Sequence, residues 1–208
     1  MSYGYFVTVF IAAIATTTAA QAADTAPTAP QLRQELLAMQ VVDQEVRSDL
    51  AKPDYKRWTE VHASNQRRLK EIVQQFGWPT VAMVGQDGAA AAWLLAQHSD
   101  SDPAFQRKVL ELMAPLVEKG EASAKNYAYL YDRTHVPQRF GTQGNCVSKE
   151  TWLPFEIEDI GGLAERRRQA GMPTMAEYAD VFKDICRDGY TPNSAPDPTR
   201  RTIPLPSP

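Results

Sequence analysis

The chain has 208 residues, of which 43% are hydrophobic and 23% are charged, and its formal net charge is −3 at pH 7. This length and balance predict a single globular domain with a sizeable core, flanked by tails. The lack of a basic excess argues against nucleic acid as a partner, because phosphate binding depends on clustered Lys and Arg side chains.

The N-terminal segment differs from the rest of the chain, because residues 1–22 contain no charged side chain. Phe6–Ala15 is an apolar run of the length found in secretory signals, and Ala20-Gln21-Ala22 fits a small-x-small cleavage site. An uncleaved membrane anchor is the alternative, but the run is shorter than the ~20 residues that cross a bilayer. We therefore expect a signal peptide, a mature protein that begins at Ala23 without a stable membrane span, and export to the periplasm or the medium.

Helical patterns dominate the mature chain. Residues 23–31 are small and Pro-rich and predict a flexible lead-in to a helical domain at 32–188. The clearest pattern covers 58–76, where apolar side chains recur at helical spacing before Gly77 and Pro79 end the helix. Other helical patterns cover about residues 32–51, 89–98, 103–120, 122–133, 159–170 and 175–187.

Two regions lack this pattern. Residues 136–157 mix Gly, Pro and β-forming residues, which predicts irregular loops with room for one short β-hairpin. The proline density of 189–208 tolerates no helix and predicts a disordered tail. Because strands and helices do not alternate, the expected fold is mainly α, a single-domain helical bundle with irregular loops.

The chain contains two cysteines, Cys146 and Cys186, so a single pairing exists. In an oxidising compartment a disulfide is the expected state. A catalytic thiol is the alternative, but neither cysteine has a histidine near it in the sequence. We therefore predict a structural disulfide.

A short junction between two helical patterns carries His98, Asp100 and Asp102. Asp102 followed by Pro103 is typical of a helix N-cap and first turn, and His98 suits the C-terminal end of the preceding helix. The same side chains suit a general base with an orienting carboxylate, or a divalent ion. No HExxH, CxxC or His-rich tract supports an ion, so we expect neither a metal nor another cofactor.

Two further segments carry polar residues of interest. Asp132 and Arg133 lie at the end of a tyrosine-bearing helix, where the helix dipole disfavours a carboxylate, so Asp132 is expected to pair, most simply with an arginine. Gln143 lies between Gly141 and Gly144, which let the backbone approach a ligand closely. A tight turn without a ligand is the alternative for this loop.

Several motifs carry a resemblance. The stretches FGWPT, QHSDSDPAFQ, YLYDR, FGTQ and RRRQAGMPTMAEY together resemble a bacterial domain family of unknown function, over about residues 58–182. The resemblance implies that the segments carrying the polar residues described above belong to one domain. These residues are His98, Asp102, Gln106, Asp132, Arg133 and Gln143. The two cysteines lie outside the motifs.

The sequence supports three interpretations of function. The first is a binding or interaction domain for a small molecule or protein, whose polar cleft uses His98, Asp102, Gln106, Asp132, Arg133 and Gln143. The second is a hydrolase or lyase with His98 as general base and Arg133 as anion stabiliser, Asp102 and Asp132 being further catalytic candidates. The third is a structural envelope protein. An enzyme predicts a carboxylate against His98 and a void beside the ring, whereas a binding cleft predicts a normally solvated ring.

Overall fold

A computed structural model describes residues 26–48, 54–189 and 201–205. This part of the chain is mainly helical with one antiparallel hairpin, which confirms the expected fold class. Its elements are α1 (Pro30–Ser48), α2 (Tyr55–Phe76), α3 (Val81–Gln97), α4 (Pro103–Val117), α5 (Ala124–Thr134), β1 (Gly144–Ser148), β2 (Thr151–Pro154), α6 (Leu163–Gln169) and α7 (Met175–Gly189).

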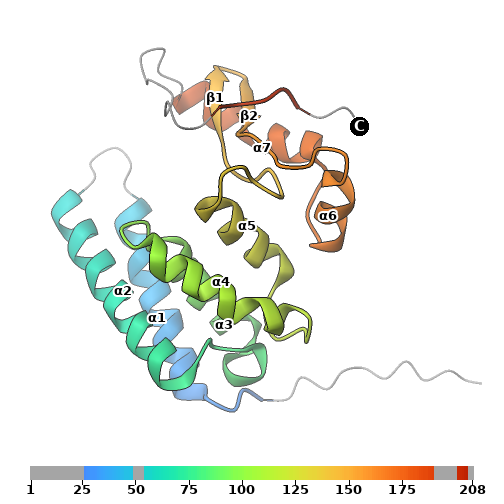
Figure 1. Ribbon diagram of the computed structural model, residues 1–208. Helices are drawn as coiled ribbons and strands as arrows, with labels where there is room; N and C mark the ends of the chain where they lie inside the picture. Colours follow the sequence, from blue (N-terminus) through green and yellow to red (C-terminus); the bar gives the residue numbers. More distant parts are fainter. Residues whose placement is uncertain (1–25, 49–53, 190–200, 206–208) are drawn as a thin grey trace, which may run out of the picture.

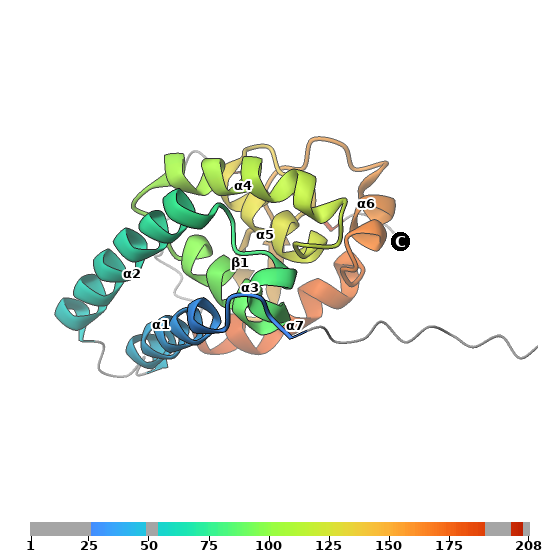
Figure 2. The ribbon, with the colours of Figure 1, turned by 90° about the horizontal axis from the view of Figure 1, so that it is seen from below.

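The helices α1 to α4 form the lower part of the molecule as drawn in Figure 1, and α5 leads from them to the hairpin, α6 and α7. The helices α1 and α2 lie side by side, as both views show (Figures 1 and 2). The helix α3 packs most extensively against α1, and α4 against α5. The junction between α3 and α4 is thereby placed beside the first two helices.

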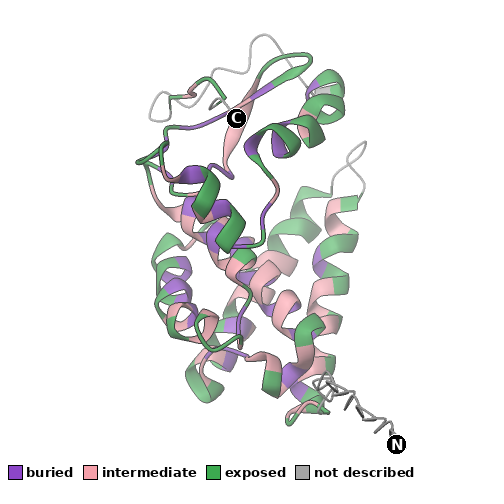
Figure 3. Cartoon of the chain, turned by 90° about the vertical axis from the view of Figure 1, so that its right-hand side faces the viewer, coloured by how far each residue is buried: buried purple, intermediate pink, exposed green. Residues whose placement is uncertain are grey.

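Two main apolar cores follow this division. The first is built from α1 to α5 and contains Leu36, Leu69, Ile72 and Val84, all fully buried. Figure 3 shows how buried and exposed residues alternate along the helices, as amphipathic packing requires. The second core lies between the hairpin, α6 and α7, and its members are Trp152, Ile157, Leu163, Met175, Tyr178, Ala179 and Cys186.

Cys146 on β1 and Cys186 on α7 form a disulfide, with Cα atoms 5.4 Å apart, as predicted. In the hairpin, Cys146 pairs with Trp152 of β2, which is buried in the second core. The disulfide therefore fixes the hairpin to the last helix across the second core.

Local signals explain where the helices begin and end. At the end of α2, Gly77 adopts a φ of 74° and donates its N–H to the Val73 carbonyl, as expected for a terminating glycine. The helix α3 begins earlier than residue 89, because Thr80 caps it by accepting a hydrogen bond from the Met83 N–H. A kink at Gly85, with φ 72°, lets the helix continue through the apparent break in the sequence.

The flanking segments differ from expectation in part. Thr28 and Ala29 donate their backbone N–H groups to carbonyls of α3, and α1 begins at Pro30, so the end of the lead-in is ordered. The described tail residues 201–205 run beside the end of β2, where the Ile203 N–H donates to Pro154, in contrast to the expected disorder. The predicted signal peptide lies outside the described residues. No helix among the described residues is long and apolar enough to cross a membrane.

Candidate functional site

The junction between α3 and α4 is a tightly hydrogen-bonded turn. His98 is the C-cap of α3, and the buried Ser99 hydroxyl donates to the Leu95 carbonyl. Asp102 caps α4 as predicted, because its carboxylate accepts the Phe105 N–H at 2.9 Å. These contacts fix the backbone that carries His98.

His98 lies against a carboxylate from another helix. Its Nδ1 is 2.7 Å from Oδ2 of Asp43, whose side chain is 1% exposed on α1. His62 of α2 is the next neighbour, with Nε2 3.7 Å from Oδ1 of the same aspartate. We call Asp43, His62 and His98 the His–Asp cluster. Three separate segments of the fold therefore supply its members.

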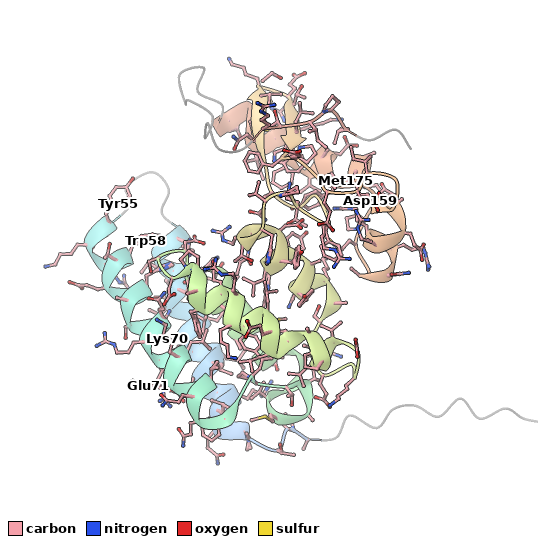
Figure 4. The ribbon with its side chains drawn as sticks, viewed as in Figure 1. Tyr55, Trp58, Lys70, Glu71, Asp159 and Met175 are labelled. Carbon is pink, nitrogen blue, oxygen red and sulfur yellow. A yellow bond between two sulfur atoms is a disulfide. The ribbon has the colours of Figure 1, made fainter. Side chains whose placement is uncertain are left out.

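Arg47 and Trp58 complete the surroundings of His62. The Arg47 guanidinium lies 3.3 Å from Asp43 Oδ2 through its Nε, and its Nη2 contacts His62 Nε2. The Trp58 ring is 4.4 Å from the His62 ring, centroid to centroid, and Arg47 lies over the indole. Trp58, labelled in Figure 4 near the start of α2, marks this end of the helix pair.

The cluster shifts the pKa values of two of its members. Burial alone would raise the pKa of Asp43, but hydrogen bonds from His98 and Gln44 and the positive charge of Arg47 outweigh it, so this pKa is lowered. Burial and the neighbouring Arg47 charge lower the pKa of His62. An ionised Asp43 and a neutral His62 are therefore favoured at neutral pH.

Arg133 joins α5 to the junction. Its Nε donates to Asp100 at 2.6 Å and its Nη2 reaches the second carboxylate oxygen, so the pair is bidentate. Gln106 donates to the carbonyls of Ala96 and Gln97, at 3.1 and 3.2 Å, and also reaches Asp100. Asp100 therefore brings Arg133 and Gln106 together beside His98.

Comparison with known proteins places this chain within a family. The model of a family of unknown function, DUF6624, matches residues 30–189, most of the chain. The chain belongs to DUF6624. No match was found among curated proteins or among solved structures. The match confirms the expected membership of a family of unknown function, and the DUF6624 span contains the whole His–Asp cluster.

In this DUF6624 domain, Asp132 holds a loop, and no salt bridge joins it to an arginine among the described residues. Its fully buried carboxylate accepts the backbone N–H groups of Arg139, Phe140 and Thr142, at 2.9, 3.1 and 2.8 Å. Burial raises the pKa of Asp132, and these hydrogen bonds oppose the rise. Backbone amides, and not an arginine side chain, therefore donate the hydrogen bonds that satisfy this carboxylate at the unfavourable helix end. The charge of Asp132 still acts on the buried Arg167, where it opposes the lowering of the Arg167 pKa by burial.

Gln143 belongs to the same loop. Its N–H donates to Gln138 Oε1 at 2.7 Å, and its side-chain amide donates to Thr142 Oγ1 at 3.1 Å. Among the described residues, no hydrogen bond or ion pair joins Gln143 to His98. Its predicted place in a shared cleft therefore stays a prediction.

Asp102 and a cavity beside α3 lie apart from the cluster contacts. Besides its cap, Asp102 pairs with Lys70 of α2. A cavity of about 400 Å³ opens beside the first half of α3, and none of the predicted site residues lines it. Its lining includes Trp78, Trp93, Met113, Ser123 and Asn126.

Sequence reasoning found His98 and Arg133 but missed Asp43 and His62. Asp43 continues the buried helical stripe of Leu32 and Leu36, so an ionisable side chain at that place was a signal. An acid on the core face of a helix needs a buried partner. The identity of that partner depends on packing between α1 and the junction.

Chemically, the arrangement offers an imidazole oriented by a buried carboxylate. Nδ1 of His98 faces Asp43, and Nε2 has no hydrogen-bond partner among the described residues. The side chain remains 17% exposed, and Nε2 is not among the buried side-chain atoms that lack a partner, so this nitrogen can be reached from solvent. Such an imidazole can accept a proton at Nε2 while the carboxylate stabilises the resulting charge.

Proposed function

We propose that this DUF6624 domain is an enzyme of the hydrolase or lyase class in which His98 acts as general base. The observation that carries the proposal is the 2.7 Å contact between His98 Nδ1 and the buried Asp43 carboxylate. A carboxylate in this position selects the tautomer with the proton on Nδ1, which leaves a lone pair on Nε2.

The proton transfer follows from this tautomer. Nε2 of His98 removes a proton from a water or from the substrate, and the imidazolium that forms is stabilised by Asp43. The lowered pKa of Asp43 keeps the carboxylate ionised before the proton arrives. Because Asp43 is buried, its charge acts on the ring with little screening by solvent.

Arg133 is proposed to stabilise an anionic group of the substrate or transition state. Nε and Nη2 of Arg133 are committed to Asp100, whereas Nη1 has no hydrogen bond among the described residues. The bidentate pair fixes the plane of the guanidinium near the junction that carries His98. A fixed donor of this kind needs little reorganisation when negative charge develops.

The binding interpretation predicts a normally solvated His98 and therefore receives less support. The ring lies largely buried against a carboxylate, which a purely binding cleft does not require. In that alternative, Gln143 takes part in the cleft, and the ligand is either a small molecule or a protein.

The base can be tested without a known substrate. Diethyl pyrocarbonate acylates unprotonated imidazole nitrogens, so we expect His98 to react readily in the folded protein. The Asp43→Asn variant should lower the rate at His98 several-fold, while His135, the C-cap of α5, which bonds to the Tyr131 carbonyl, keeps its rate. Peptide mass spectrometry measures each site, and circular dichroism checks that the variant folds.

Unchanged labelling of His98 in the Asp43→Asn protein would contradict the orienting role of the carboxylate. Turnover is then sought with chromogenic esters, phosphoesters and other small hydrolase substrates. The His98→Gln variant should lose any activity found, and His135→Gln should retain it.

We also propose that the protein is exported to the periplasm or the medium. The disulfide between Cys146 and Cys186 supports an oxidising compartment. Intact-mass analysis of material recovered outside the cytoplasm should give a chain that begins at Ala23; a mass that includes residues 1–22 would contradict cleavage at this site.

A further inference from the structure

Two of the three histidines of the chain meet at one buried aspartate. One nitrogen each of His62 and His98 and one oxygen of Asp43 lie within 4.8 Å of one another. The three side chains come from α2, the end of α3 and α1, so they converge through tertiary packing and not through a local motif. Nothing in the sequence required this convergence.

The donor set suits a divalent first-row metal ion. Two imidazole nitrogens with one carboxylate are common ligands of Zn²⁺, and three protein ligands leave a coordination position open. Tetrahedral ligands about 2.1 Å from an ion are separated by roughly 3.4 Å. The cluster approaches this size already, because His62 Nε2 and Asp43 Oδ1 are 3.7 Å apart.

A positive group already bridges part of the cluster. The Arg47 guanidinium contacts Asp43 through Nε and the His62 lone pair through Nη2. Arg47 lies in the last turn of α1 and its side chain is 28% exposed, so it can turn toward solvent without passing through the core. Apart from the Trp58 indole beneath it, the contacts that hold the Arg47 guanidinium are the contacts that an ion would take.

We propose that the His–Asp cluster binds one divalent metal ion of the Zn²⁺ class, and that the Arg47 guanidinium fills the site when the ion is absent. The ion replaces the Arg47 guanidinium at Asp43 and His62. His98 changes tautomer: Nδ1 gives up its proton to solvent, Nε2 takes one from solvent, and the Nδ1 lone pair then faces the ion. This departs from the expectation of no metal.

Ion binding does not rest on the role proposed for His98 in catalysis. A bound ion takes the Asp43 oxygen and the Nδ1 position that orient the base, and it leaves the proton on Nε2. The ion therefore suppresses the base and protects His98 from acylation. Labelling of His98 without metal tests the base, and metal binding by itself tests the ion site.

The test is calorimetric titration of the metal-free mature protein with ZnCl2. We expect one ion per chain, and an affinity reduced roughly tenfold or more in each of the variants Asp43→Asn, His62→Asn and His98→Gln. His135→Gln, outside the cluster, should bind as the unmodified protein does. Circular dichroism establishes that each variant is folded.

Arg47→Ala supplies the distinguishing result. Removing the competing guanidinium should increase the affinity for Zn²⁺ several-fold. Arg57→Ala is the matched control, because Arg57 forms an exposed pair with Glu45 and should leave the affinity unchanged. Protection of His98 from diethyl pyrocarbonate by Zn²⁺ gives a second readout that uses the unmodified chain.

Two results would overturn the metal site. The first is that neither the unmodified protein nor Arg47→Ala binds Zn²⁺. The second is that the variants without a cluster ligand bind Zn²⁺ as tightly as the unmodified protein, which would mean an adventitious ion only. Equal or weaker binding by Arg47→Ala would overturn the exchange with the guanidinium.

Discussion

Asp132 shows how one buried carboxylate can organise a loop. Both of its oxygens accept backbone N–H groups from the segment that follows α5: Oδ1 from Arg139 and Phe140, and Oδ2 from Thr142. Without this acceptor, the three amide groups would lose their partner, and that of Thr142 would be left buried and unpaired. The residue therefore determines the conformation of the FGTQ loop.

Replacing Asp132 by Asn should destabilise the protein by about 1–3 kcal/mol, because a side-chain amide then faces the Thr142 N–H and leaves it unsatisfied. Urea unfolding measures the change. Asp180→Asn, which alters an exposed pair with Lys183 on α7, is the matched control and should stay within about 0.5 kcal/mol. Equal midpoints for the two variants would show that the loop does not depend on Asp132.

The partners of single residues could be predicted from the sequence only where the partner lies nearby along the chain. The cap at Asp102 was predictable, because its signal is the next residue, Pro103. The partner of His98 was not, because Asp43 lies 55 positions away and meets it through packing of α1 on α3. Arg133 stood out in the sequence, but its partner Asp100 could be identified only from the place where α5 ends.

At the scale of elements, the N-terminus of α4 links helix stability to the position of His98. Asp102 accepts the Phe105 N–H and also pairs with Lys70 of α2. The first contact satisfies a helix-end donor, whereas the second is a partly exposed ion pair of small net value. The cap should therefore dominate the effect of substitution.

Asp102→Ala should lower the free energy of unfolding by about 1 kcal/mol, and Asp102→Asn should lower it less, because asparagine keeps the capping oxygen while losing the charge. Lys70→Ala isolates the ion pair. The measurement is urea denaturation of the three variants in parallel. If Lys70→Ala cost as much as Asp102→Ala, the ion pair and not the cap would stabilise this helix end.

Most helices were predictable from the sequence. Where an observed helix differs in length from the expected one, the cause is local. The spacing of apolar residues located α2, and Gly77 ended it as expected. The start of α3 was missed because Gly85 and Gly88 resemble breaks, although the first is a kink and the second packs against Val84 inside the helix. The helix α6 is shorter than expected because residues 159–162 form a turn in which Asp159 accepts the Gly162 N–H.

At the scale of the whole molecule, the two cores differ in what holds them together. The first has long helices with extensive apolar faces, whereas the second is a short hairpin packed on α6 and α7. Small cores of this kind gain most from a covalent link. The disulfide joins β1 to α7 within the second core, while the His–Asp cluster is carried by the helices of the first.

Loss of the disulfide should therefore act unequally on the two cores. A link across 40 positions contributes up to about 4 kcal/mol by restricting the unfolded chain. In a Cys146→Ser, Cys186→Ser double variant, amide hydrogen exchange should accelerate in β1, β2 and α7, with little change in α2 and α3. The second core would then open below the free energy of global unfolding.

The same double variant also tests whether the His–Asp cluster is independent of the second core, because no residue of the cluster belongs to that core. Diethyl pyrocarbonate labelling of His98 should keep the rate of the unmodified protein, and adding reductant to the variant should change nothing further. Faster exchange spread evenly over α1 to α7 would instead mean that the two cores unfold as one cooperative unit. In that case the disulfide would stabilise the cluster as well, and His98 labelling would change with it.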